Sequence, residues 1–349
     1  MSASAGAALA SDALVLALET SCDDTCAAVV SGDGVVRANV VSSQGVHDRF
    51  GGVVPEIASR EHLRVINAVI DDALARAGAG LGDVELVAVT QGPGLVGALL
   101  VGLATAKALA AARGLPLAPV DHLQGHVAAN YLAPDPLAPP FLCLIASGGH
   151  TLLGSVTRHD DFVVLGRTLD DAAGEAFDKG ARLLGLGYPG GAALERLAAD
   201  GDPEAFAFPD GSGRRGRSSA FGRGLDFSFA GLKTALLYKV RDLGEQEVQR
   251  RRGDLAASYQ AAIASALASR AERALEQTGL TELALGGGVA ANGAVRERLR
   301  ALGVPVHVPG RELCTDNAAM IASAARFGAV LAYPGYLDLD AYATGERPR

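Results

Sequence analysis

The sequence predicts an α/β protein made of two lobes that share a similar plan. The chain has 349 residues, more than one ordinary domain needs, and 49% of them are hydrophobic while 20% are charged. Its 44 glycines and its low aromatic content of 5% suit tight turns and close packing between strands and helices. A proline-rich segment at 133–140 separates two runs of strands, polar turns and helices. We therefore expect a repeated βββαβα-type core in two halves that face a central cleft.

The first half alternates apolar runs typical of buried strands with periodic segments typical of helices. A polar turn at 19–25 follows the first strand, and a Gly-Asp-Gly turn at 32–34 joins the next two. Strands are expected at 13–18, 26–30, 35–41, 86–90 and 116–120. Helices are expected at 95–112 and at 57–77, the latter with Arg60, Glu61, His62 and Arg64 at its polar positions.

The second half begins again with a strand, a small polar turn and another strand. Its strands are expected at 141–146, 152–156 and 282–285, and its helices at 289–302 and 316–330. We expect a first lobe of 12–135, completed by a C-terminal helix at 316–332, and a second lobe of 136–315. Residues 333–349 are expected to form a loosely held tail.

Composition limits the class of function. The four cysteines lack the spacing of a disulfide framework, and the N-terminal residues lack the basic segment of a signal peptide. The longest apolar stretch, 95–106, is too short to span a bilayer, so we expect a cytoplasmic protein with no membrane partner. The net charge of −8 argues against a protein that coats nucleic acid by itself. A basic segment at 211–224 is either a solvated loop or a nucleic-acid contact.

Two of the seven histidines, His122 and His126, stand four residues apart. On a helix this spacing places both imidazoles on one face, where they could bind one transition-metal ion. A pair of solvated surface histidines is the alternative. A third ligand must come from elsewhere, and Asp316 is a candidate because the repeated plan brings helix starts to the cleft.

Glycine turns after buried strands suit phosphate binding, since their backbone N–H groups can converge on an anion. Two such turns, at 147–149 and 286–288, occupy equivalent places in the plan. Asp171, Glu175 and Asp178 have helical spacing on one face, where a carboxylate could accept hydrogen bonds from ribose hydroxyls. An exposed acidic helix face explains the same spacing.

Residues 14 to about 330 closely resemble the tRNA threonylcarbamoyladenosine transferase family of the bacterial TsaD type, formerly called O-sialoglycoprotein endopeptidase. The resemblance rests on short segments that occur in the order of the family. These are ETSCDDT (19–25), VPEIASREH (54–62), GPGL (92–95), HLQGH (122–126), SGGHT (147–151), DDAAGEAFDK (170–179), YPGG (188–191), FSFAGLKT (227–234), GGGVAAN (286–292) and CTDN (314–317).

The resemblance implies a two-lobed actin-like ATPase fold and one metal ion per subunit, iron in the family with zinc as the alternative. By resemblance the metal ligands are His122, His126 and Asp316. The substrate threonylcarbamoyl-AMP would be bound by Ile145, Ala146, Ser147, Gly148 and Gly149 at its phosphate and by Asp178, Gly191 and Asn292 at its nucleoside. The catalytic candidates are Asp23 and Asp24, and Asp24 stands where many relatives have Glu.

The resemblance also implies a tRNA substrate, modified at the adenosine 3′ of the anticodon in tRNAs that read ANN codons. The candidate tRNA contacts are Arg182, Arg214, Arg215, Arg217, Arg223 and Lys233. The implied protein partners are a non-catalytic actin-like paralogue of the TsaB type and a small ATPase of the TsaE type.

Three other functions are alternatives to this transferase. A zinc protease helix carries Glu directly after its first histidine, and here that residue is Leu123. A sugar kinase or ATPase of the same fold needs Mg²⁺ held by carboxylates and waters, for which two histidines are unsuitable ligands. A non-catalytic scaffold such as the partner paralogue lacks the histidine pair.

Overall fold

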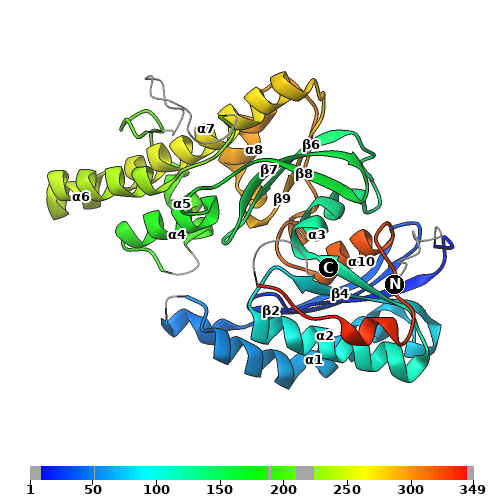
Figure 1. Ribbon diagram of the computed structural model, residues 1–349. Coiled ribbons are helices and arrows are strands. Elements are labelled where there is room, and N and C mark those ends of the chain that lie inside the picture. The colour runs from blue at the N-terminus through cyan, green and yellow to red at the C-terminus, as the bar shows by residue number, and fades with distance from the viewer. Residues whose placement is uncertain (1–8, 51, 188–189, 210–223, 344–349) are drawn as a thin grey trace. The chain divides into compact units, whose positions relative to one another are not determined.

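The computed structural model describes residues 9–50, 52–187, 190–209 and 224–343. The chain divides into two compact units, unit 1 with Met1–Ala138 and Thr315–Arg349 and unit 2 with Pro139–Cys314. Each unit contains a five-stranded mixed sheet with helices packed against it (Figure 1). Unit 1 is therefore discontinuous in sequence, and unit 2 is one continuous stretch.

The sheet of unit 1 has the strand order β3-β2-β1-β4-β5. The strands are β1 (Leu14–Glu19), β2 (Asp24–Ser31), β3 (Val36–Ser43), β4 (Val84–Gly92) and β5 (Leu117–Asp121). The first three strands are antiparallel, whereas β4 and β5 run parallel to β1. The central strands form near-continuous apolar runs because helices cover both of their faces.

Helices cover this sheet on two sides (Figure 1). One side carries α1 (Pro55–Ala77) and α2 (Val96–Arg113), and the other carries the short helices α3 (His122–Ala128) and α10 (Ala318–Ala325). Within the described part of the chain, α2 is the one helix whose length and apolar composition would allow it to cross a membrane. It packs against α1 and β4, with Leu103 and Ala106 buried in the core of unit 1.

The sheet of unit 2 repeats the plan with the order β10-β9-β6-β7-β8. Its strands are β6 (Phe141–Ala146), β7 (Thr151–Arg158), β8 (Asp161–Arg167), β9 (Leu283–Gly286) and β10 (Val306–His307). Its helices are α4 (Ala173–Leu183), α5 (Gly191–Ala198), α6 (Ala230–Arg250), α7 (Arg252–Thr278), α8 (Gly293–Arg300) and α9 (Arg311–Cys314). As in unit 1, the first strand pairs antiparallel with the second and parallel with a later strand. The predicted repetition of the α/β plan is confirmed.

The described residues also include five 3-10 helices. They span Gly45–Phe50, Leu81–Asp83, Ala129–Tyr131, Gly288–Ala291 and Gly335–Asp338. The predicted helix at 289–302 is shorter than expected and begins at Gly293, because the side chain of Asn292 accepts a hydrogen bond from the backbone N–H of Val295 and so caps the helix there. The last helix is likewise capped by Asn317 and ends at Ala325, short of the expected 330.

The expectation of a loosely held tail at 333–349 is wrong for residues 334–343, and residues 344–349 lie outside the described residues. Tyr336 is 0% exposed, and Tyr342 is 6% exposed. The ammonium group of Lys107, on α2, donates hydrogen bonds to the carbonyl oxygens of Leu337 and Leu339. The position at the end of the chain predicted a loosely held segment, but its two buried tyrosines and its backbone contacts hold residues 334–343 against the rest of unit 1.

Candidate metal centre and glycine turns

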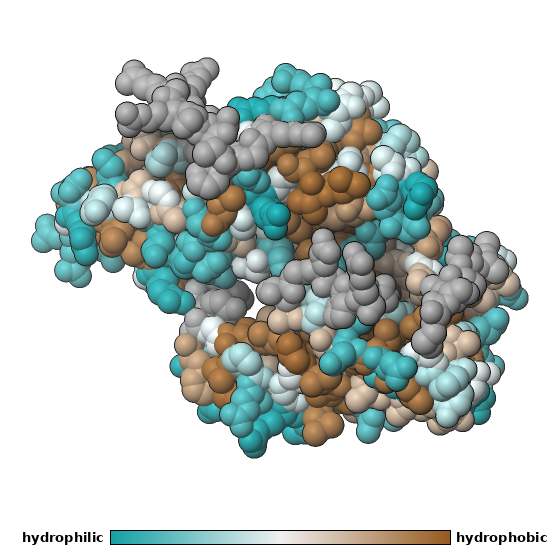
Figure 2. All heavy atoms as spheres, in the orientation of Figure 1, coloured by the Kyte–Doolittle hydropathy of each residue, from teal (hydrophilic) through white to brown (hydrophobic). Residues whose placement is uncertain are grey.

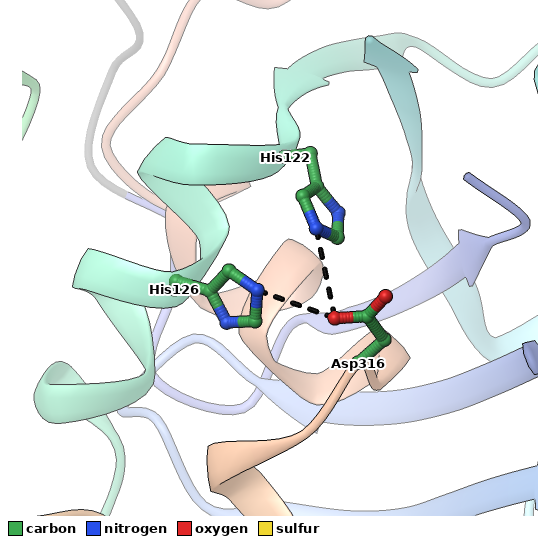
Figure 3. Close-up of side chains that lie close together, drawn as sticks. All are labelled: His122, His126 and Asp316. Atoms are coloured by element: carbon green, nitrogen blue, oxygen red, sulfur yellow. Dashed lines mark ion pairs between the residues drawn. The ribbon is translucent and has the colours of Figure 1, made fainter. Parts of the chain in front are cut away.

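Three side chains from two distant segments of the sequence meet in unit 1. His122 begins α3, His126 lies one turn later, and Asp316 precedes α10 (Figure 3). One ligand atom of each residue lies within 4.8 Å of the others. The Oδ1 atom of Asp316 is 3.6 Å from Nε2 of His122 and 3.2 Å from Nε2 of His126. The structure therefore brings together the three residues that the sequence singled out.

These residues fit a metal ion. Both ring nitrogens of His126 are buried, and neither forms a hydrogen bond among the residues that the structure describes, although Oδ1 of Asp316 lies 3.2 Å from Nε2. Buried polar atoms almost always have a partner, and a metal ion on Nε2 would supply one. Two imidazoles and one carboxylate are a donor set that iron and zinc accept, and three ligands leave coordination positions for a substrate.

Glu19, at the end of β1, contacts the other nitrogen of the His122 ring. Its Oε2 atom lies 2.9 Å from Nδ1 of His122 and accepts a hydrogen bond of 2.6 Å from Oγ1 of Thr90. The backbone N–H of Ser21 donates to Oε1. A carboxylate on the second nitrogen of a ligand histidine fixes the tautomer and orientation of the ring. The sequence around Glu19 did not indicate this role.

Neighbouring carboxylates hold a proton on His122 when no metal is present. Burial lowers the pKa of His122, but the charges of Asp316 and Glu19 outweigh it and raise this pKa to about 9. Burial acts to raise the pKa of Glu19, whereas the adjacent His122 lowers it, and the net direction is downward. A metal ion at this imidazole has to displace the proton, so metal affinity is expected to increase with pH up to about 9.

The predicted acid–base residues lie in the turn between β1 and β2 and at the start of β2. Burial raises the pKa of Asp24 to about 6, and the nearby charges of Asp316 and Asp23 add to the increase, while a hydrogen bond from Ser43 opposes it. A carboxylate with this pKa is mostly ionised at neutral pH and can accept a proton.

The buried imidazole of His62, on α1, holds the same turn. Its Nδ1 atom is 2.7 Å from Oγ1 of Thr25, and its Nε2 atom is 3.0 Å from the carbonyl oxygen of Cys22. His62 is 0% exposed, so the expectation that it occupies a polar, outward position is wrong. Helical periodicity predicted a polar position for His62 because it reports only neighbouring residues of the sequence. It cannot show that residues from another segment bury the imidazole and bond to it.

The two glycine turns of unit 2 lie side by side, because β6 and β9 are parallel neighbours with Ile145 opposite Gly286. Gly287 has a φ of +84°, and a Cβ atom there would lie 2.4 Å from the carbonyl oxygen of Ala146. Only glycine permits this close approach of the two turns. A Cβ at Gly148 or Gly149 would meet nothing within 4 Å, so the first turn has open space beside it.

Two predicted nucleoside-binding residues shape the backbone near these turns. Oδ1 of Asp178 accepts hydrogen bonds from the backbone N–H groups of Gly190, at 2.7 Å, and Gly191, at 3.2 Å. Burial raises the pKa of Asp178, and these two hydrogen bonds oppose the increase. The amide of Asn292 donates to Oε1 of Gln260, at 2.9 Å, besides capping α8.

The expected single acidic face of 171–178 is not observed. The ammonium group of Lys179 lies 2.6 Å from Oδ1 of Asp171 and 2.8 Å from Oε1 of Glu175, whereas Asp178 bonds to the glycine backbone. The helix begins only at Ala173, so Asp171 precedes it. The three carboxylates therefore have different partners. Lys179 balances the charges of Asp171 and Glu175, and two backbone N–H groups bind Asp178.

The candidate tRNA contacts are only partly described. Arg214, Arg215, Arg217 and Arg223 lie outside the described residues. Arg182 is in the last turn of α4, and Lys233 is in the first turn of α6.

Known proteins match most of this chain. The family model described as tRNA N6-adenosine threonylcarbamoyltransferase, TsaD, matches residues 35–323. A protein of that name from Symbiobacterium thermophilum is 53% identical over 319 residues, which cover 90% of this chain and 91% of the relative. Another, from Thermomicrobium roseum, is 47% identical over 358 residues, which cover 95% and 96%.

Among solved structures, component A of the (R)-2-hydroxyglutaryl-CoA dehydratase of Acidaminococcus fermentans matches with a TM-score of 0.54 and 15% identity. The match covers 94% of this chain and 100% of that chain. At this identity the likeness concerns the fold alone, and it confirms the expected actin-like ATPase fold.

Proposed function

We propose, because the chain belongs to the TsaD family of tRNA N6-adenosine threonylcarbamoyltransferases, that it transfers the threonylcarbamoyl group from threonylcarbamoyl-AMP to tRNA. The acceptor is the exocyclic amine of the adenosine 3′ of the anticodon in tRNAs that read ANN codons. The amine nitrogen bonds to the carbamoyl carbon, the bond from that carbon to the phosphate oxygen breaks, and AMP leaves.

The observation that carries this proposal beyond the family is the buried cluster of His122, His126 and Asp316. These residues would hold one metal ion, iron or alternatively zinc. When bound, the ion supplies a positive charge that orients and polarises the donor. Glu19 keeps the ring of His122 in place, since it holds Nδ1 while Nε2 faces Asp316.

The glycine turns of unit 2 supply the other half of the proposal. Backbone N–H groups of 145–149 would bind the phosphate of the adenylate and stabilise the charge on AMP as it leaves. Asp178, Gly191 and Asn292 would shape the pocket for the nucleoside. The phosphate would then be bound mainly by main-chain groups of unit 2.

Asp24 is the proposed general base, with Asp23 as the alternative. Its raised pKa of about 6 leaves the carboxylate ionised at neutral pH while making it a stronger proton acceptor than an ordinary aspartate. The proton of the attacking amine would pass to this carboxylate. We expect the transfer rate to increase with pH through about 6 if Asp24 has this role.

The proposal includes partners. Arg182, Lys233 and the arginines of 214–223 would contact tRNA in the cytoplasm, and a TsaB-type paralogue with a TsaE-type ATPase would assist turnover.

The helices α1 and α2 of unit 1 carry exposed apolar side chains. Leu63 on α1 is 70% exposed, and Val96 and Leu100 on the neighbouring α2 are 41% and 43% exposed. Figure 2 shows hydrophobic atoms over the face of unit 1 on which these helices lie. Such apolar surface supports a protein partner on unit 1.

The test is a reconstituted transfer reaction with threonylcarbamoyl-AMP, an unmodified ANN-decoding tRNA transcript and the two partner proteins. Modified adenosine is quantified for the wild type, for His126→Ala and for His307→Ala. His307 lies on β10 and is 3.4 Å from Glu282, so it serves as a histidine outside the cluster. Product from the wild type and from His307→Ala, but not from His126→Ala, supports both the reaction and the metal centre.

Two outcomes contradict different parts of the proposal. No product from wild-type protein that carries metal would overturn the transferase. Equal product from all three proteins would retain the transferase and overturn the role of the metal centre.

A further inference from the structure

The C-terminal segment 334–343 reaches the end of the sheet that carries the histidine helix; it is the red segment on unit 1 in Figure 1. Nε2 of Gln91 donates a hydrogen bond of 2.8 Å to the carbonyl oxygen of Asp340. The backbone N–H of Tyr342 donates to the carbonyl oxygen of Gln91, at 3.3 Å, and that of Gly94 donates to Ala343, at 3.1 Å. These contacts place Tyr342 beside the end of β4.

One carboxylate joins this segment to the helix that bears the histidines. The hydroxyl of Tyr342 donates a hydrogen bond of 2.5 Å to Oδ2 of Asp121. The other oxygen of the same carboxylate, Oδ1, accepts from the backbone N–H groups of Leu123, at 2.9 Å, and Gln124, at 3.1 Å. Asp121 is therefore the N-cap of α3, and Tyr342 orients the capping group.

The helix depends on such support because it has only seven residues, 122–128, and a helix of this length is unstable without tertiary contacts. Its other side is packed against α10. A Cβ atom at Gly125 would lie 2.8 Å from Cδ1 of Ile321 and 3.3 Å from Cγ of Met320. The cap at Asp121 therefore fixes the end of α3 at which His122 stands.

The backbone of β4 leaves space for this tyrosine. Gly92 has a φ of +158°, and a Cβ atom there would lie 2.3 Å from the carbonyl oxygen of Tyr342 and 2.9 Å from its ring. The aromatic ring is thus seated against a position that has no side chain. Tyr342 is 6% exposed as a result.

We propose that Tyr342 is a positioning residue for the metal centre, which it supports by orienting Asp121 at the start of the histidine helix. The effect on metal binding rests on the proposed function, whereas the effect on the helix is a property of the chain alone. Removing the hydroxyl should loosen the first turn of α3 and lower metal affinity without removing a metal ligand.

The test compares Tyr342→Phe with Tyr336→Phe, which removes a hydroxyl from the same segment. The hydroxyl of Tyr336 is buried and has no hydrogen-bond partner among the described residues, so it is a matched control. Amide hydrogen exchange of residues 122–128 is measured in the metal-free proteins. We expect exchange about tenfold faster in Tyr342→Phe than in the wild type, the effect of losing a hydrogen bond to a charged group, and no change in Tyr336→Phe.

Metal affinity is then measured with Zn²⁺ and with Co²⁺ by competition against a chromophoric chelator. We expect Tyr342→Phe to bind about tenfold more weakly and Tyr342→Phe/Asp121→Ala to bind no more weakly than Asp121→Ala alone, because the tyrosine acts through the carboxylate. Unchanged exchange at 122–128 in Tyr342→Phe would overturn the proposal. A wild type that binds neither metal while the exchange difference persists would overturn the metal centre and retain the support of α3 by Tyr342.

Discussion

The candidate metal centre of unit 1 and the glycine turns of unit 2 are built by opposite means. In unit 1, His122, His126 and Asp316 present side-chain atoms, and Glu19 supports one of them. In unit 2, the turns at the ends of β6 and β9 present backbone groups, and Gly287 is required because a side chain would strike the neighbouring turn. The metal centre depends on the identity of its side chains. The glycine turns depend on the absence of a side chain at Gly287.

This difference separates the two regions experimentally. Substitution of a candidate metal ligand in unit 1 should remove a coordinating atom and leave the sheet intact. Addition of one methyl group at Gly287 in unit 2 should instead alter the path of the backbone. A variant of one region should therefore leave the main property of the other unchanged.

The largest effect is expected from His126→Ala. Loss of a metal ligand should reduce bound metal to background and lower the transfer rate by about 10³-fold, the loss typical when a pre-organised charge is removed from a site. Metal content after gel filtration and single-turnover transfer are measured together. Binding of an adenylate analogue, which we assign to unit 2, should persist, and its loss would show that the two regions are not separable.

Glu19→Gln should have the next largest effect. The amide keeps the volume but cannot hold His122 Nδ1 as a carboxylate does, so metal affinity should fall by about 10- to 100-fold. Thr90→Val, which removes one donor to Glu19, should produce a smaller decrease. The measurement is a metal titration against a chelator, and equal affinity in wild type and Glu19→Gln would contradict the assigned role.

Gly287→Ala tests the backbone region. The φ of Gly287 is +84°, and the added Cβ would lie 2.4 Å from the carbonyl oxygen of Ala146. Both effects strain the folded state, so the substitution should lower the free energy of unfolding by about 3 kcal/mol. Gly148→Ala, where a Cβ meets nothing within 4 Å, should change stability by less than about 0.5 kcal/mol. Denaturant unfolding measures both. Metal affinity of Gly287→Ala should equal that of the wild type, and a decrease would break the comparison.

Asp24→Asn should give the smallest change. The folded-state pKa of about 6 exceeds the ordinary value of 3.8, so the folded protein holds the proton more tightly and loses stability as pH rises from about 4 to 6. In metal-free protein, Asp24→Asn should therefore be more stable than the wild type by on the order of 2 kcal/mol at pH 7 to 8, with no difference below pH 4. Thermal unfolding against pH measures this, and an equal gain at every pH would exclude ionisation as the cause.

The sequence predicted the parts of each region that depend on local pattern. The spacing of His122 and His126 indicated one helical face, and the glycine runs after apolar strands indicated phosphate-type turns. Asp316 required the further argument that the plan repeats. Each of these features is visible within a few residues or in the order of the elements.

The residues that were missed act across long sequence separations. Glu19 and Tyr342 meet the histidine helix through contacts of 103 and 221 residues in sequence, and no local periodicity reports such pairs. His62 was placed at a polar helix position for the same reason, although its partners bury it. The boundaries of α8 and α10 shifted because side-chain caps, Asn292 and Asn317, decide where those helices begin.

The discontinuity of unit 1 has a consequence for biosynthesis. Unit 2 is a single stretch, Pro139–Cys314, whereas unit 1 needs Thr315–Arg349 to be complete. Between the synthesis of His126 and that of Asp316 a ribosome adds 190 residues (316 − 126), which takes roughly 10–40 s at ordinary elongation rates. His122 and His126 are therefore synthesised well before Asp316, and unit 2 can fold in the interval. The three candidate metal ligands are present together only near the end of synthesis.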